Sequence, residues 1–245
     1  MKPLIFRSLA FGEKLFSWSQ GRGYGSATLK KEVAAALPFV RNDAVVFDVG
    51  ANHGKWAQEM LARSGTRIRT LYAFEPSKHN DSKIISLDDG RIVLVPKAVS
   101  NQAGSATLHY DEAGSGLASL TLRRLDFRGL TMTMAEPVET TTLDAFIAEQ
   151  GIEKVDFAKF DIEGHELDAL RGAEKALTNH IIGALAFEFG GCNIDTRTYF
   201  RDFWYFLTER GYKLARINPF FTPMPIRNYS EALEDFRITN IIASL

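Results

Sequence analysis

Cysteine, net charge and long apolar runs are all scarce in this chain of 245 residues. Cys192 is the single cysteine, so no disulfide can form within the chain, and we expect a reduced, cytoplasmic protein. The formal net charge is -1. A chain so close to neutral lacks the broad basic field that holds nucleic-acid phosphates, and we expect no nucleic-acid partner.

Apolar residues gather in the first sixteen positions, but charged residues interrupt them at Arg7, Glu13 and Lys14. No long apolar run remains, so we expect neither a secretion signal nor an integral membrane segment. Three apolar residues still share one face of a helix, namely Ile5, Leu9 and Phe16. We therefore expect residues 1–43 to form a helical segment that caps the active site or contacts a second copy in a homodimer. A helix lying on a membrane surface is the alternative.

From residue 44 onward, strand-like and helix-like segments alternate. The strand-like segments are 45–49, 70–74, 92–95, 155–160 and 182–189, and the helix-like segments are 55–62, 77–87, 143–150, 166–177 and 198–210. This alternation predicts an α/β fold of the Rossmann-like kind, with a parallel sheet and right-handed crossovers.

Two departures from this rhythm refine the predicted fold. Segments 106–110, 118–122 and 138–142 are predicted to be strands or extended segments between glycine-containing loops, which indicates an inserted β element. Segments 212–217 and 238–243 are predicted to form a closing antiparallel pair. The sequence therefore predicts a seven-stranded sheet in a single domain over residues 44–245.

A glycine-rich turn, Asp48-Val49-Gly50-Ala51-Asn52-His53-Gly54, follows the first buried strand and opens a helix. Glycine permits a tight turn and a close ligand, and a helix N-terminus presents unpaired N–H groups. A dinucleotide site would carry a third glycine that is missing here. An acidic residue at Asp48 suits a cationic ligand better, and S-adenosylmethionine carries both an ammonium and a sulfonium.

Glu75 ends the second strand, within Phe74-Glu75-Pro76-Ser77. A carboxylate there can accept hydrogen bonds from both hydroxyls of a ribose. NAD enzymes use the same device, so an NAD-dependent oxidoreductase is one alternative. A non-catalytic binding module with a Rossmann-like fold is another.

Ionisable residues crowd the end of the strand at 155–160, where Asp161, Glu163, His165 and Glu166 follow one another. The carboxyl edge of an open α/β sheet is where ligands bind. His165 is a candidate general base because its ordinary pKa lies near neutral pH, with Asp161 and Glu163 as the alternatives. We expect no metal, although Asp161, Glu163 and Glu188 offer the hard oxygen ligands that Mg²⁺ prefers.

Four blocks together resemble the FkbM-type methyltransferases, a branch of the class I S-adenosylmethionine enzymes. They are residues 47–54, residues 74–77, Lys97-Ala98-Val99-Ser100-Asn101 with Gly104, and Lys159-Phe160-Asp161-Ile162-Glu163-Gly164-His165-Glu166 with Leu170 and Gly172. The resemblance covers about residues 44–217, and its last block is the most specific.

The resemblance implies a class I methyltransferase fold and methyl transfer to oxygen. Family members act on sugar hydroxyls of glycans or glycolipids and on hydroxyls of polyketide-type natural products, and we expect a saccharide acceptor. By the family pattern, Glu75 holds the ribose and Ala98 and Val99 lie by the adenine. The full set of expected cofactor-binding residues is Asp48, Gly50, Ala51, Asn52, Gly54, Glu75, Pro76, Ser77, Ala98, Val99 and Asp161.

Overall fold

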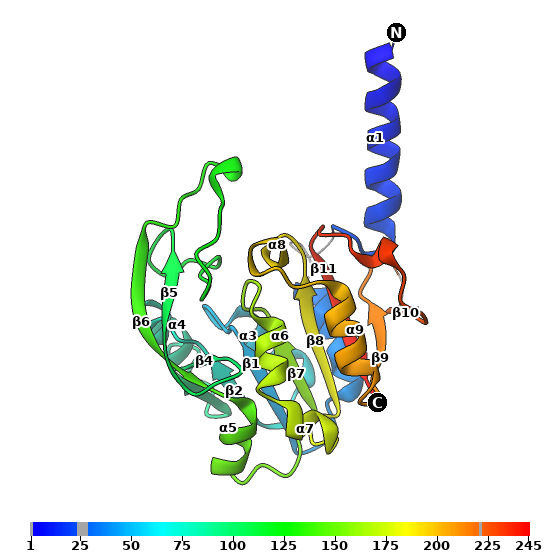
Figure 1. Cartoon of the computed structure of the whole chain (residues 1–245). Helices are drawn as coiled ribbons and strands as arrows, with labels where there is room; N and C mark the ends of the chain where they lie inside the picture. Colours follow the sequence, from blue (N-terminus) through cyan, green and yellow to red (C-terminus); the bar gives the residue numbers. More distant parts are fainter. Residues whose placement is uncertain (1, 24–28, 221) are drawn as a thin grey trace.

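The computed structural model describes residues 2–23, 29–220 and 222–245, with side chains from residue 6 onward. A central sheet of eight strands has the order β10-β9-β11-β8-β7-β1-β2-β3 (Figure 1). These strands are β1 (Ala44–Val49), β2 (Ile68–Phe74), β3 (Ile92–Val95), β7 (Phe157–Phe160), β8 (Ala184–Phe189), β9 (Lys213–Arg216), β10 (Met224–Ile226) and β11 (Thr239–Ser244).

The five neighbouring strands β3, β2, β1, β7 and β8 are parallel, and β11 runs antiparallel between β8 and β9. The predicted Rossmann-like α/β fold and its closing antiparallel pair are thus confirmed. The eighth strand, β10, was not predicted from the sequence, because three residues centred on a proline show no alternating pattern.

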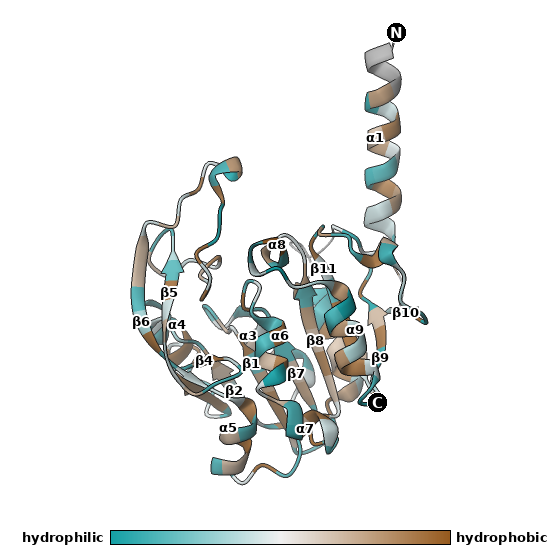
Figure 2. Cartoon of the chain, viewed as in Figure 1, coloured by the Kyte–Doolittle hydropathy of each residue, from teal (hydrophilic) through white to brown (hydrophobic). Residues whose placement is uncertain are grey.

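Helices cover both faces of the sheet, so every residue of β1 is buried. Side chains alternate along a strand. Val45, Phe47 and Val49 accordingly join the apolar core on one face, and Ala44 and Val46 join the core on the other. The first core includes residues of α5 (Leu143–Glu149), α6 (Glu166–Arg171), α7 (Glu174–Thr178) and α9 (Phe200–Thr208), and the second includes residues of α2 (Leu29–Ala36), α3 (Lys55–Ser64) and α4 (Lys78–Ile85). Figure 2 shows the apolar residues concentrated on the central strands.

The predicted helix over 166–177 is divided into α6 and α7, and Gly172 lies between them. A side chain at this position would collide with the carbonyl oxygen of Ser100. The close approach fixes the loop after β4 (Ala98–Val99) against the end of α6.

A second, three-stranded sheet is inserted between β3 and α5, with the order β4-β6-β5. Strands β5 (Gly104–Tyr110) and β6 (Met134–Thr141) are antiparallel. The excursion between them, residues 111–133, is called the arm below, and it carries the short helix η3 (Asp126–Arg128). The predicted strand at 118–122 is wrong: Ser119 alone bridges to His109, and the side-chain hydroxyl of Ser119 is directed to another loop.

The N-terminal segment is helical, as predicted, and its two helices differ in their packing. Helix α1 (Lys2–Ser19) projects away from the sheet (Figure 1), and the Trp18 ring packs edge-to-face on Phe220 at 5.2 Å. Helix α2 packs on α3, and its residues Leu29 and Glu32 line the cavity described below. Across the described residues, no helix combines the length and the apolar content that crossing a bilayer requires. The sequence also predicts a loop over the glycine-containing segment 21–26, and part of this segment lies outside the described residues.

Candidate functional site

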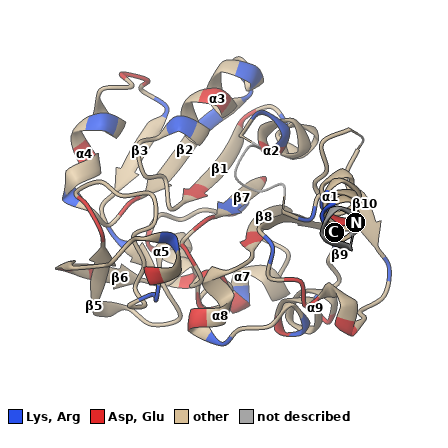
Figure 3. Cartoon of the chain, turned by 90° about the horizontal axis from the view of Figure 1, so that it is seen from above, with Lys and Arg blue, Asp and Glu red and all other residues tan. Residues whose placement is uncertain are grey.

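A cavity of about 580 Å³ opens at the carboxyl ends of β1, β2, β7 and β8, under the arm. Seen along this edge in Figure 3, acidic segments at the ends of β1 and β8 flank a basic segment on β7. Most of the expected site residues line the cavity: Gly50, Ala51, Asn52, Glu75, Pro76, Ala98, Val99, Asp161, Glu163, His165 and Glu188. Asp48, Gly54 and Ser77 do not line it.

The glycine-rich turn is tied to the neighbouring strand. The backbone N–H groups of Gly50 and Ala51 both donate to the carbonyl oxygen of Phe74, each at 3.0 Å. Gly50 has a φ of +83°, and a side chain there would collide with the carbonyl oxygen of Asp161. The turn therefore leaves open backbone at the cavity wall, as a closely held cofactor requires.

Glu75 is 6% exposed, and its carboxylate is held by the surrounding loops. It accepts hydrogen bonds from Asn52 N (2.7 Å), Ser77 N (3.0 Å) and Asn80 Nδ2 (3.3 Å). Burial raises the pKa of Glu75, and these three hydrogen bonds oppose that rise. The carboxylate is thus fixed beside the turn at the cavity wall, in a position that suits a ribose.

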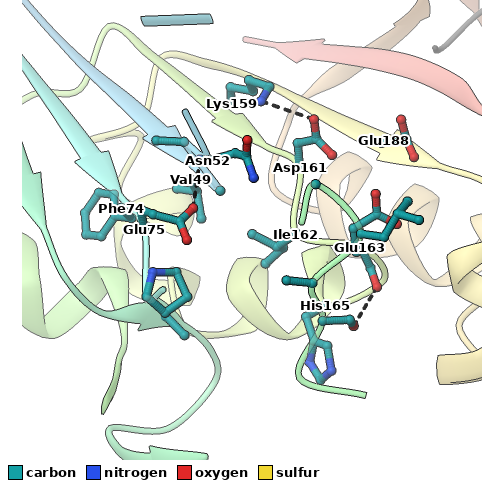
Figure 4. A pocket seen from close by; sticks show the side chains of 18 of the residues that line it. Val49, Asn52, Phe74, Glu75, Lys159, Asp161, Ile162, Glu163, His165 and Glu188 are labelled. Carbon is teal, nitrogen blue, oxygen red and sulfur yellow. Dashed lines mark hydrogen bonds and ion pairs between the residues drawn. The ribbon is translucent and has the colours of Figure 1, made fainter. Parts of the chain in front are cut away.

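Asp48 lies within β1 and not in the turn, which corrects the placement expected from the sequence. Its side chain is fully buried, and its carboxylate is 3.5 Å from Lys159 Nζ. Lys159 Nζ also lies 3.2 Å from Asp161 Oδ2, at the edge of the cavity (Figure 4). Burial lowers the pKa of Lys159, but the carboxylates of Asp161 and Asp48 outweigh it, so the pKa is raised and the ammonium persists. Asp48 therefore does not line the cavity itself but pairs with Lys159, which does.

Glu166 is fully buried and does not reach the rim, in contrast to the sequence-based expectation. Its carboxylate accepts hydrogen bonds from Ile162 N (2.9 Å) and Gly164 N (3.1 Å). Burial raises its pKa to about 7. Glu166 shapes the loop that presents Glu163.

Glu163 projects into the cavity from a left-handed backbone position with a φ of +54°. Its carboxylate pairs with the guanidinium of Arg123, whose Nε is 3.3 Å from Asp195. Burial and the nearby Asp161 raise the pKa of Glu163 to about 7, although Arg123 opposes the rise. A carboxylate with that pKa can accept a proton near neutral pH.

His165 also lines the cavity, but its ring is engaged by the arm. Its Nε2 lies 2.8 Å from Thr121 Oγ1, and its Nδ1 lies 3.8 Å from Asp168 Oδ2. Burial lowers the pKa of His165, so the ring is neutral at pH 7. The Glu163 carboxylate and the neutral His165 ring are thus both candidate proton acceptors at the cavity.

The three carboxylates considered for a metal do come together. Ligand oxygens of Asp161, Glu163 and Glu188 all lie within 4.8 Å of one another. Two of the three already have a cation of the chain beside them, since Lys159 pairs with Asp161 and Arg123 with Glu163. Burial, followed by the charges of Asp161 and Glu163, raises the pKa of Glu188 well above its ordinary value. Two of the three carboxylates are thus paired with the protein's own cations, and the third lies close enough to share a metal ion with them.

Several residues of the site carried no usable signal in the sequence. Arg123 and residues 115–120 come from the arm, and Leu29 and Glu32 come from α2. None belongs to a motif, and only the fold brings them to the carboxyl edge. Lys159 lies within a recognised block, but its ion pairs across two strands are visible only in three dimensions.

Comparisons with known proteins identify the family of the chain. The Methyltransferase FkbM domain matches residues 48–214. The chain is 24% identical over 187 residues to the 2-O-methyltransferase NoeI of Sinorhizobium fredii, covering 69% of this chain and 74% of NoeI. It is 25% identical over 144 residues to the hexuronic acid methyltransferase AglP of Haloferax volcanii, covering 58% of this chain and 54% of AglP.

Matches to solved structures were also found. A methyltransferase FkbM from Methylobacillus flagellatus matches with a TM-score of 0.49 and 18% identity, over 82% of this chain and 43% of that one. An rRNA methylase from Streptococcus thermophilus matches with a TM-score of 0.47 and 12% identity, over 87% of this chain and 93% of that one. Since the family match spans more than half of the sequence, the chain belongs to the FkbM family of S-adenosylmethionine-dependent methyltransferases.

Proposed function

We propose that this protein transfers a methyl group from S-adenosylmethionine to a hydroxyl oxygen of a saccharide, in a glycan, a glycolipid or a sugar-containing metabolite. The observation that carries the proposal is the place of Glu163. Its carboxylate, with a pKa of about 7, lines the same cavity as the glycine-rich turn and Glu75. A proton acceptor beside a cofactor site is what transfer to a weakly acidic hydroxyl requires.

Each part of the cofactor can be assigned to residues that line the cavity along the sheet edge. Glu75 would hold the ribose, and Ala98 and Val99 would lie by the adenine. The open backbone of the turn at Gly50 would face the methionine part, and Asp161 would face its ammonium. When bound, S-adenosylmethionine supplies an electrophilic methyl group on a sulfonium.

The protein's own contribution is to place the acceptor and to remove a proton. An acceptor hydroxyl held at the ends of β7 and β8 would form a bond to the methyl carbon as the bond from that carbon to sulfur breaks and S-adenosylhomocysteine leaves. The hydroxyl proton would pass to Glu163. Holding the reacting atoms in line is worth up to about 7–11 kcal/mol, and general base catalysis contributes about 10²- to 10⁴-fold. His165 is the second candidate base, and its contact with Thr121 makes it less available.

Two relatives support oxygen and saccharide as the acceptor. One is a 2-O-methyltransferase, and the other is a methyltransferase of hexuronic acid, which is a sugar acid. Transfer to a hydroxyl of a polyketide-type natural product is the competing outcome within the same family.

A panel of acceptors tests the proposal. The purified protein is incubated with S-adenosylmethionine and neutral saccharides, uronic acids or polyketide alcohols, and S-adenosylhomocysteine release is measured. NMR of the product then identifies the methylated atom. We expect an O-methyl ether on a saccharide, and methylation of nitrogen or carbon, or of polyketide alcohols alone, would refute it. Stabilisation against heat by S-adenosylhomocysteine, and not by NAD, checks the cofactor separately.

A further inference from the structure

The arm reaches Glu163 from a distant part of the chain. Arg123, in the arm, is 6% exposed, and its guanidinium lies between two carboxylates from other segments. One belongs to Glu163, in the loop after β7, and the other to Asp195, in α8 (Cys192–Thr196). A buried guanidinium is stable only when it is paired, and its planar fork fixes the direction of each partner.

The arm also holds the backbone of Glu163. Ser119 Oγ donates a hydrogen bond of 2.9 Å to the carbonyl oxygen of Glu163. A non-glycine residue with a positive φ is strained and persists only where its surroundings enforce it, as for Glu163 here. The arm thus contacts Glu163 at both its backbone and its carboxylate.

We propose that Arg123 is a positioning residue for methyl transfer, which holds the Glu163 carboxylate at the acceptor side of the cavity and is itself held by Asp195. The proposal rests on the proposed function, because it takes Glu163 as the proton acceptor. The Arg123 guanidinium makes one ion pair with Glu163 and one with Asp195. A misplaced base costs turnover even when the cofactor binds normally.

Arg124 provides a matched control in the next position of the same arm. Its side chain is 86% exposed and pairs with Asp126, within the arm. Its backbone N–H donates to Asp195, but a side-chain substitution leaves that donor in place. The two arginines therefore share a loop and a charge, and they differ in whether the guanidinium reaches Glu163.

The test compares Arg123→Ala, Arg123→Lys, Asp195→Asn and Arg124→Ala with the unaltered protein. For Arg123→Ala we expect kcat to fall by about 100-fold, while the KM for S-adenosylmethionine and the Kd for S-adenosylhomocysteine change less than about twofold. Arg123→Lys should recover part of kcat, and added guanidinium ion should partly rescue Arg123→Ala without rescuing Glu163→Gln. Asp195→Asn should show a smaller loss of kcat, and Arg124→Ala none.

A wild-type kcat in Arg123→Ala would overturn the proposal. So would a joint loss of kcat and cofactor binding that neither lysine nor guanidinium ion corrects, because that pattern belongs to a residue that only stabilises the fold. Crystal structures of the Arg123→Ala and Arg124→Ala complexes with S-adenosylhomocysteine give a readout that needs no turnover. The Glu163 carboxylate should leave its position in the first variant and keep it in the second. If the unaltered protein methylates no saccharide, the proposed function fails, and these structures still decide the role of Arg123.

Discussion

The two halves of the cavity are built in different ways. In the cofactor half, the Glu75 carboxylate receives hydrogen bonds from Ser77 and Asn80, two and five residues further along the chain. In the acceptor half, Glu163 is held by Arg123, 40 residues earlier, and by Ser119, 44 residues earlier. The cofactor half is thus built from the chain just after β2 and from the glycine-rich turn, which supplies a third hydrogen bond to Glu75 through Asn52. The acceptor half instead joins the loop after β7 to the arm. Substitutions should therefore separate cofactor binding from turnover.

The largest expected effect on binding lies in the cofactor half. Glu75→Ala should weaken S-adenosylhomocysteine binding by about 100-fold or more, because it removes the ribose acceptor and leaves the N–H of Asn52 without its partner. Isothermal titration calorimetry measures this directly. Glu139→Ala is the control, since that side chain is 72% exposed at the second sheet. Equal affinities in all three proteins would show that Glu75 does not hold the cofactor.

The next effect belongs to the acceptor half alone. Glu163→Gln should lower kcat by about 10²- to 10⁴-fold, with S-adenosylhomocysteine binding nearly unchanged, because the amide keeps the shape and loses the base. His165→Ala should cost less, about tenfold, through the loss of its contact with Thr121. Steady-state kinetics with a saturating cofactor measures both. The reverse ranking of the two variants would make His165 the base.

A pH profile sharpens the same comparison. Glu163 must be ionised to accept a proton, and its pKa is about 7. We therefore expect kcat to be fully developed above pH 8 and to fall with decreasing pH through 7, by about tenfold for each further unit. The decline should be absent in Glu163→Gln. Binding of S-adenosylhomocysteine, measured over the same range, should not follow this curve; if it does, the titration belongs to the cofactor half.

The smallest expected effect concerns metal removal. Lys159 and Arg123 already pair with Asp161 and Glu163, so EDTA should change kcat by less than about twofold. The measurement is a comparison of kcat in EDTA and in added Mg²⁺. A loss in EDTA that Mg²⁺ restores would assign Asp161, Glu163 and Glu188 to a cation and would change the chemistry of the acceptor half.

The cofactor half could largely be predicted from the sequence, and the acceptor half largely could not. The glycine-rich turn, Glu75 and the strands that carry them could be predicted, because contiguous residues encode them. Asp48 was placed in the turn but lies in β1, two positions before the turn begins at Gly50, because the sequence does not mark where the strand ends. Within the arm, a strand was predicted at 118–122 because the side chains there suit a sheet. In the structure, polar groups of this segment bond to other loops instead. Arg123 had no local signal, since its partners lie beyond any motif.

Gly50 joins the two halves, because its backbone packs against the carbonyl of Asp161 with no room for a methyl group. This contact therefore limits how loops could be exchanged to give a new acceptor specificity. An acceptor loop grafted after β7 can vary in its side chains, but its first peptide must keep the path that Asp161 takes here. Diversification of the acceptor side should accordingly proceed through the arm and α8, which can change without disturbing that contact.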